Sequence, residues 1–598
     1  MAEAIRNRNE IEAKYKWDLT HIYADDEAWQ ADYDQVMAGI AEAAAWDGRV
    51  AEDPKAAIRA VQTLSERIMP VYEYAFLRKE TDNADPVAQG LKDKALRLYV
   101  TAGAATAFLQ PELLELPGET LEALMADPEM KDYDAMLRNV LLMKPHTLPK
   151  EEEKLIAMMG EVADAPDAIF TSLTTADMKL PPIRLADGSM QELTEGNYST
   201  FIHSEDREIR RQAFQHLMTT YEAFGNTIAS TYAASVKKDQ FMAEAHHFDS
   251  ARQAAMKPLE IPEAVYDNLI DVIHEYIPVL QEYLRLRKKL LGLDELHLYD
   301  LYAPMVKGYQ MKLPYEKAFD LVLEGLSPMG EDYLDKLREA RTGGWIDVYP
   351  STGKSSGAFS AGDLREVHPY VLLNHNDNLE SAFTIAHELG HSMHSFYSNT
   401  HQPAPKSDYS LFVAEVASTC NESVMMRYLT ETMKEPAAQA YLLNYFLEQF
   451  RTTVFRQTMF AEFEKISHEM AQQGIPLTKE SLSEAYFRLN ETYYGETCFM
   501  DPEIASEWMR IPHFYRAFYV YVYATGLCAA VSLSEKILTE GESAVADYRK
   551  FLCAGCSVPP IDALKLAGID MSSPEPIRRA MEVFRETVRK MEEATKKL

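Results

Sequence analysis

Two histidines flank a glutamate in the segment His387-Glu388-Leu389-Gly390-His391. Residues four apart on a helix project from the same face, one turn apart. Two neutral imidazoles at that spacing can reach one Zn²⁺ at about 2.0–2.1 Å. Glu388 is rotated out of the ligand pair, where its carboxylate can contact a metal-bound water. The spacing therefore predicts a zinc centre in which Glu388 takes a proton from a water that attacks a carbonyl.

A third protein ligand is expected, because catalytic zinc sites usually take three and keep one position open. The candidates are His394, His401, Glu415 and Glu422. His394 lies further along the same helix, where it could serve as a supporting group. Residues 410–428 look helical, and an acid among their apolar neighbours would be costly to bury without a partner. A metal removes that cost, so the residues favour Glu415 slightly over Glu422 and leave both open.

The segments around the two histidines should hold them in place. Residues 370–374 read as a strand, and Asp377 with Glu380 forms a plausible capping pair for the next helix. That helix is predicted to run to about Ser398. Its apolar positions form one buried stripe, so the histidines are expected on a well-anchored element.

Most of the chain shows helical periodicity, with apolar residues at three- and four-residue steps. The clearest segments are residues 25–45, 53–82, 86–109, 206–245, 262–292, 435–473 and 574–598. Strand signals are few: two short runs around Asp187-Gly188 and a second group at 345–349 and 370–374. The sequence therefore predicts a mainly α protein with a small sheet beside the histidine helix. A composition break near 178–200 divides it into an N-terminal helical lobe, 1–200, and a catalytic domain, 201–598.

Composition argues against several classes of partner. The formal net charge of -33 over 598 residues argues against nucleic acid and against anionic membrane lipids, since both attract clustered Lys and Arg. The first residues lack the apolar segment of a secretory signal. Five cysteines form no visible disulfide framework. We expect a cytoplasmic protein with no nucleic-acid or membrane partner; no pattern indicates its oligomeric state.

Several ordered motifs resemble oligoendopeptidase F, within the thimet-oligopeptidase-like zinc peptidases. They are Lys14–Leu19, Asp377–His394, Phe412–Ser418, Asn421-Glu422, Ile511–Tyr515, Phe518–Tyr521, Tyr523–Gly526 and Gly568–Met571 followed by Ser573-Pro574. They span nearly the whole chain. The resemblance implies one zinc ion held by His387, His391 and Glu415, with Glu388 as the general base. It makes Glu422 a supporting residue that orients a ligand.

The resemblance also implies a fold and a substrate. The expected molecule is a large, helical, two-lobed, clam-like zincin with the metal at the bottom of a deep channel. Narrow access would limit substrates to unfolded oligopeptides that are cut internally. The glycine-bearing segment 353–362 and the strand 370–374 are similar to the family's substrate-facing loop and edge strand. A peptide could add to such an edge through main-chain hydrogen bonds.

His513 and a nearby tyrosine are expected to stabilise the oxyanion that forms during hydrolysis. His513 matches the family's histidine, and each aimed donor can lower the barrier by about 3–4 kcal/mol. We predict Tyr521 as its partner, with Tyr515, Tyr519 and Tyr523 as alternatives. Two rival functions remain open: a zinc carboxypeptidase or other exopeptidase, and a non-catalytic peptide-binding protein with the same fold.

Overall fold

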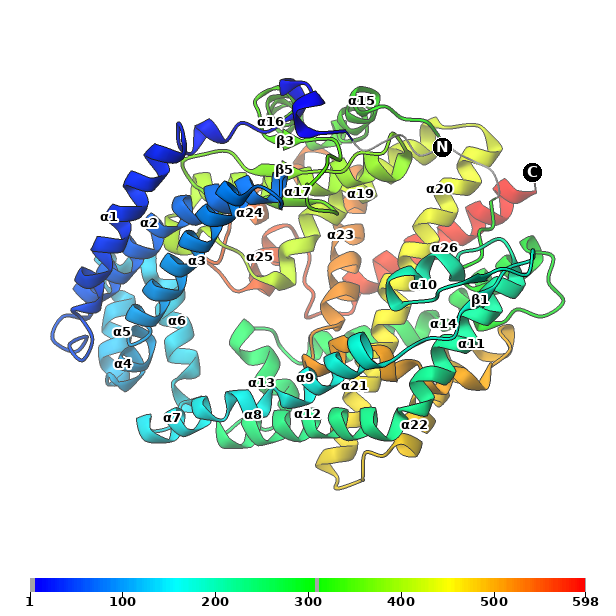
Figure 1. Ribbon diagram of the computed structural model, residues 1–598, viewed down its shortest axis with the longest axis horizontal. Coiled ribbons are helices and arrows are strands. Elements are labelled where there is room, and N and C mark those ends of the chain that lie inside the picture. The colour runs from blue at the N-terminus through cyan, green and yellow to red at the C-terminus, as the bar shows by residue number, and fades with distance from the viewer. Residues whose placement is uncertain (1–5, 307–310, 597–598) are drawn as a thin grey trace. The chain divides into compact units, whose positions relative to one another are not determined.

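The computed structural model describes residues 6–306 and 311–596, and this part of the chain is mainly helical, as predicted (Figure 1). It divides into two compact units, each assembled from three separate segments. The first unit comprises Met1–Thr147, Gln310–Leu429 and Ala530–Asp570, and the second comprises Leu148–Tyr309, Thr430–Ala529 and Met571–Leu598. The predicted division at residue 200 follows the sequence order, whereas each unit contains segments from both sides of that residue. That division stays a prediction.

Three long helices begin the first unit and pack against one another: α1 (Asp26–Ala44), α2 (Pro54–Thr81) and α3 (Pro86–Thr106). Each starts at an aspartate whose side chain accepts a backbone N–H of the first turn, and proline opens α2 and α3. The unit also contains α4 (Leu109–Glu115), α5 (Gly118–Ala126), α6 (Asp134–Met143), α15 (Tyr315–Gly325), α16 (Glu331–Thr342), α17 (Leu379–His401), α18 (Ala404–Ser407), α24 (Glu542–Leu552) and α25 (Pro560–Leu566). Two helices, α19 (Leu411–Thr432) and α23 (Tyr521–Glu540), continue from one unit into the other.

The second unit is built from helices and one small hairpin. Its helices are α7 (Lys150–Met158), α8 (Gly160–Ala163), α9 (Ala165–Ser172), α10 (Glu195–Ile202), α11 (Arg207–Ala223), α12 (Gly225–Ala245), α13 (Ala251–Met256), α14 (Ala264–Leu290), α20 (Pro436–Gln449), α21 (Arg456–Gln472), α22 (Lys479–Tyr494) and α26 (Glu575–Thr595). The hairpin pairs β1 (Ile183–Arg184) with β2 (Met190–Gln191), as the Asp187-Gly188 turn predicts. Gly188 has a φ of 86°, which only glycine adopts readily.

Two of the predicted helices are each divided into two helices. The segment 206–245 breaks at Phe224, whose φ of -101° and ψ of 9° leave the helical region. In the segment 435–473, the six residues Phe450–Phe455 form a π-helical stretch between α20 and α21. Gly225 follows Phe224 directly and is a local signal for the first break, whereas the apolar periodicity continues through the second.

A three-stranded sheet in the first unit lies against α17. Its order is β3 (Ile346–Asp347), β5 (Tyr370–Leu372), β4 (Phe359–Ala361), with β5 parallel to β3 and antiparallel to β4. The prediction that 370–374 is the edge strand is therefore wrong, because β5 is paired on both sides. The edge next to it is β4, which lies inside the glycine-bearing segment. Both β4 and β5 pack on α17.

A buried lysine fixes that glycine-bearing segment to the sheet. The side chain of Lys354 is fully buried, and its Nζ forms a 2.7 Å ion pair with Asp347. The same Nζ donates to the carbonyl oxygens of Asp347, Tyr349 and Leu373 at 3.1, 2.9 and 2.6 Å. A buried ammonium needs this many acceptors to offset its lost hydration.

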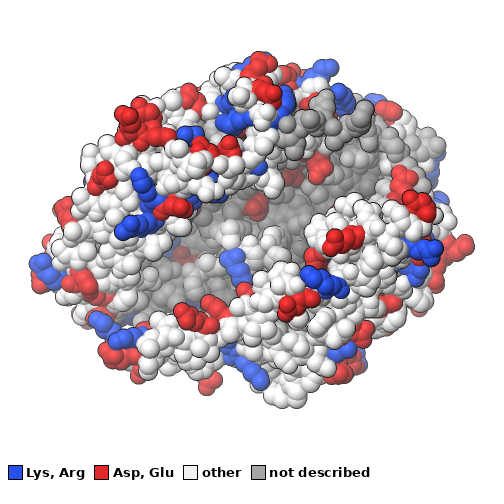
Figure 2. All heavy atoms as spheres, in the orientation of Figure 1, with Lys and Arg blue, Asp and Glu red and all other residues white. Residues whose placement is uncertain are grey.

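The surface carries both signs of charge. On the face in Figure 2, Lys and Arg side chains are scattered among Asp and Glu rather than gathered into one patch. Within the described residues, no helix combines the length and the apolar character that crossing a membrane requires.

Candidate metal centre

Helix α17 carries both histidines and begins one residue later than predicted. The Asn378 side chain accepts the Ser381 N–H at 2.8 Å, and Asn378 has the extended backbone of an N-cap. Asp377 has a φ of 51° and lies outside the helix, so the predicted capping pair of Asp377 and Glu380 is wrong. Glu380 still lies in the first turn, where an acid interacts favourably with the helix dipole.

The helices α17 and α19 approach closely at Gly390. A Cβ at this position would lie 2.5 Å from Ser418 Cα and 2.8 Å from the Ala417 carbonyl oxygen. Only glycine therefore allows the two backbones to come this near. The signal in the sequence is a glycine inside a helix, which costs about 1 kcal/mol relative to alanine and usually has a packing reason.

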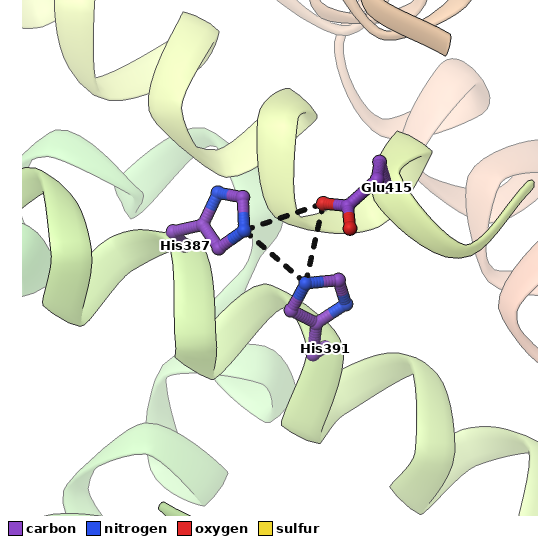
Figure 3. A group of neighbouring side chains, drawn as sticks. All are labelled: His387, His391 and Glu415. Carbon is purple, nitrogen blue, oxygen red and sulfur yellow. Dashed lines mark hydrogen bonds and ion pairs between the residues drawn. The ribbon is translucent and has the colours of Figure 1, made fainter. Parts of the chain in front are cut away.

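This approach brings Glu415 of α19 to the two histidines of α17 (Figure 3). His387 Nε2 and His391 Nε2 lie 3.2 Å apart, and Glu415 Oε2 lies 3.3 Å from each of them. Bonds of about 2.05 Å at the tetrahedral angle would separate three zinc ligands by about 3.3 Å. The triangle therefore fits the ligand set of a catalytic zinc site with one open position. In residues 6–306 and 311–596 this is the one cluster of His, Cys, Asp or Glu with metal-binding spacing.

The charges around the triangle favour a cation at its centre. Burial disfavours the imidazolium of His387, but hydrogen bonds to Glu415 and Glu422 outweigh burial and raise the pKa of His387 to about 10. The imidazoles of His387 and His391 in turn hold the pKa of Glu415 well below its usual range. In the metal-free chain, a proton on His387 thus balances carboxylates that a divalent ion could balance instead.

Residues behind the triangle orient its members. Glu422 accepts a hydrogen bond from His387 Nδ1, which leaves Nε2 directed at the triangle. Ser418 Oγ donates to Glu415 Oε2 at 3.1 Å. Asn421 Nδ2 donates to the Ala386 carbonyl oxygen at 3.0 Å and so joins α19 to the backbone of α17. Sequence reasoning assigned no role to Ser418 or Asn421.

Glu388 projects from α17 between the two histidines in sequence, and its side chain is buried. Burial raises the pKa of this carboxyl, and the neighbouring imidazoles of His387 and His391 oppose that rise. A carboxylate with a raised pKa is a stronger base than one in water.

Two of the candidates for the third ligand lie elsewhere. His394 is buried and stacks on Tyr409 with ring centroids 3.7 Å apart, and burial lowers the pKa of His394 to about 3. His401 ends α17, and its Nδ1 contacts the Tyr397 carbonyl oxygen at 2.9 Å. Neither ring belongs to the triangle.

Comparison with known proteins places this geometry in a family. The model of peptidase family M3 matches residues 200–583, which include the whole triangle, and an oligopeptidase F model matches residues 112–179. The chain belongs to peptidase family M3. Oligopeptidase PepF of Bacillus subtilis is 44% identical over 601 residues, covering 100% of this chain and 90% of that protein. Group B oligopeptidase PepB of Streptococcus agalactiae is 38% identical and covers 98% of each chain.

A solved structure agrees with this assignment. Oligoendopeptidase-F from Enterococcus faecium has a TM-score of 0.73 and 34% identity, covering 96% of this chain and all of that one. The predicted resemblance and the mainly helical fold are confirmed. The chain is a metallo-oligopeptidase of family M3.

A second group of this M3 peptidase lies in the other unit, around His513. The Tyr523 hydroxyl is 3.5 Å from His513 Nε2, and the Tyr519 ring lies parallel to the imidazole with centroids 6.5 Å apart. Tyr519 also packs edge-on against Tyr523. All three side chains are half-buried. Burial, followed by the charges of Arg456 and Arg516, lowers the pKa of His513, so the ring is neutral at pH 7 and can donate an N–H.

The other two candidate tyrosines have different surroundings. Tyr521 is only 1% exposed and packs against Tyr266 with centroids 5.1 Å apart. Tyr515 hydrogen bonds with Thr231 at 2.7 Å and stacks on Phe170. Because a donor to substrate needs access to it, this burial favours Tyr519 and Tyr523 over the predicted Tyr521.

Proposed function

We propose that this M3 peptidase is a zinc-dependent endopeptidase with one metal per chain, held by His387, His391 and Glu415. The observation that carries the proposal is the triangle of ligand atoms at 3.2, 3.3 and 3.3 Å, because its edges equal those of a tetrahedral zinc site. Glu422 and Ser418 support the set by holding one ligand each.

Zinc would supply a Lewis acid that lowers the pKa of a bound water towards 7 and polarises the scissile carbonyl. Glu388 accepts the proton of the attacking water on its carboxylate and then delivers it to the leaving amine nitrogen. Its raised pKa suits both transfers, since the ideal general base titrates near the working pH. The buried position also keeps the carboxylate from exchanging protons freely with bulk solvent.

We propose that His513 and a neighbouring tyrosine donate hydrogen bonds to the oxyanion. A neutral His513 can donate through one ring nitrogen, and Tyr523, whose hydroxyl lies at that ring, is the best-supported partner, with Tyr519 second. Tyr521 is given a packing role because its hydroxyl is buried. Two such donors would together contribute several kcal/mol to transition-state stabilisation.

Oligopeptides are the proposed substrates, as the names of the bacterial relatives suggest. Strand β4 offers an open edge of half-exposed residues, and an extended peptide could pair with its main chain. Main-chain pairing tolerates many side chains, which suits a peptidase of broad specificity. The substrate channel, the division at residue 200 and a cytoplasmic location stay predictions of this proposal.

Replacement of Glu388 by glutamine tests the base. Glu388→Gln should bind zinc like the wild type and lose about 10²–10⁴-fold in kcat, because glutamine cannot take a proton. Metal analysis and turnover of a fluorogenic peptide measure the two effects. Near-normal turnover in this variant would remove Glu388 from the mechanism, and metal-free protein indifferent to added zinc would remove the metal.

A peptide blocked at both ends separates the proposed function from its rivals. An endopeptidase cleaves it internally, and mass spectrometry of the products identifies the bond. A carboxypeptidase or another terminus-dependent enzyme leaves the peptide intact, and a non-catalytic binding protein leaves every peptide intact.

A further inference from the structure

Glu464 is a fully buried acid in the core of the second unit. It lies in the middle of α21 and is 0% exposed. The groups that influence it are Tyr266, Asp239 and the backbone of Phe518, and burial raises the pKa of Glu464 well above its usual range. Burial therefore disfavours the charged form of this carboxyl. A polar group in the core is costly unless a hydrogen bond offsets its lost hydration.

One hydrogen bond of this carboxyl joins it to a residue with an unusual backbone conformation. The Phe518 N–H donates to Glu464 Oε1 at 2.7 Å. Phe518 has a φ of 53°, a left-handed conformation that residues with a Cβ rarely adopt. Such a conformation persists only where the surroundings impose it. Here Glu464 accepts the N–H, and the Phe518 ring packs against Tyr266 and His468.

Phe518 stands directly before the tyrosines that face His513. Tyr519 is the next residue, and Tyr523 lies in the first turn of α23. The conformation of Phe518 sets the direction in which the chain enters both positions. On the His513 side, Phe514 packs against Tyr232 and Phe463.

We propose that Glu464 is a positioning residue for the oxyanion donors. It does not touch the substrate; it holds Phe518 in the left-handed conformation, so that Tyr519 and Tyr523 remain at His513. The inference rests on the donor role given above to His513 and its tyrosines. It explains why the core side of α21 contains a buried acid where an aliphatic side chain would cost less to bury.

A pair of substitutions tests the hydrogen bond itself. Glu464→Leu removes the acceptor, whereas Glu464→Gln keeps a side-chain carbonyl oxygen that can still accept from Phe518. We expect kcat to fall about ten- to hundredfold in Glu464→Leu, since a displacement of about 1 Å can cost that much. KM should change less than about twofold, and Glu464→Gln should stay within about threefold of the wild-type kcat. Equal losses in both variants, or no loss in either, would overturn the proposal.

A destabilised core is a separate explanation that the control excludes. Leu284→Ala deletes a fully buried side chain of α14 in the same unit. It should lower the melting temperature and leave kcat unchanged at an assay temperature well below melting. If Leu284→Ala lowers kcat as much as Glu464→Leu does, loss of stability accounts for both and the positioning role is refuted.

Coupling to the donors separates this inference from the function on which it depends. His513→Ala and Tyr523→Phe should each lower kcat on the blocked fluorogenic peptide. Adding Glu464→Leu to Tyr523→Phe should then lower it by a smaller factor than in the wild type, because the residues act as one unit. If His513→Ala and Tyr523→Phe retain full turnover, the donor role fails. If they lose turnover while Glu464→Leu does not, only the positioning role fails.

Discussion

Gly390 offers the sharpest test of how the metal centre is built. In Gly390→Ala, the new methyl group would lie 2.5 Å from Ser418 Cα, 2.8 Å from the Ala417 oxygen and 2.9 Å from the Ser418 nitrogen. All three are backbone atoms, so no side-chain rotation relieves the contact. Because carbon atoms pack at about 3.5 Å or more, α19 must move by about 1 Å. Glu415, one turn before Ser418, should move with it and widen the 3.3 Å edges to about 4 Å.

In Gly390→Ala, helix propensity and overpacking have opposing effects on the free energy of unfolding, whereas only overpacking affects zinc affinity. Alanine is the better helix former by about 1 kcal/mol, whereas overpacking costs about 1–3 kcal/mol. The net loss of stability should be about 1 kcal/mol. The better helix propensity of alanine does not restore the position of Glu415. We therefore expect zinc affinity to fall at least about tenfold, the loss typical when residues that orient a ligand are disturbed.

Competition with a chromophoric chelator measures the zinc affinity, and thermal unfolding of the metal-free protein measures the stability. Gly90→Ala is the matched control, because Gly90 lies inside α3 with no atom within 4 Å of an added Cβ. The control should gain up to about 1 kcal/mol and keep its zinc affinity. If Gly390→Ala behaves like Gly90→Ala in both measurements, the close approach of the helices does not build the site.

Three further predictions concern the support of the site. Glu422→Ala should weaken zinc binding about 10–100-fold, because His387 Nδ1 loses its acceptor, and Glu422→Gln should lose less. Zinc binding at pH 7 should release about one proton, because His387, with a pKa of about 10, is protonated in the metal-free chain. Zinc affinity should therefore rise with pH up to about pH 10. Calorimetry in buffers of different ionisation enthalpy measures the release, and an enthalpy independent of buffer would contradict it. Lys354→Ala should destabilise the fold by about 1–3 kcal/mol, because three carbonyl oxygens lose their donor while the buried Asp347 keeps its ion pair with Arg8. The exposed Lys565→Ala should change stability by less than about 1 kcal/mol, and thermal unfolding measures both.

Local spacing was enough to predict the part of the centre that one helix carries. His387 and His391 share a face because helical geometry alone places residues four apart on one side. The same local rules predicted the β1–β2 hairpin, since its glycine must adopt a positive φ. They failed at the start of α17, where Asp377 and Asn378 are both good caps by residue type and only the backbone conformation distinguishes them.

The third ligand required the tertiary structure. Glu415 and Glu422 lie on the same helix among apolar sequence neighbours, and residue type alone left both open. Glu415 reaches the triangle and Glu422 reaches the back of His387 because Gly390 sets the depth at which α19 packs on α17. That depth depends on contacts between segments about 28 residues apart, which no periodicity encodes.

The tyrosines show the same division. The sequence by itself determined that His513 is followed by several phenols in an apolar stretch. Which phenol stands beside the imidazole depends on where α23 begins and on the left-handed Phe518 that precedes it. A buried carboxyl on another helix holds that residue, and a contact between distant segments leaves no mark in the local pattern. The geometry within one helix or turn follows from the order of its residues. The distance at which two backbones pack depends on contacts throughout the core.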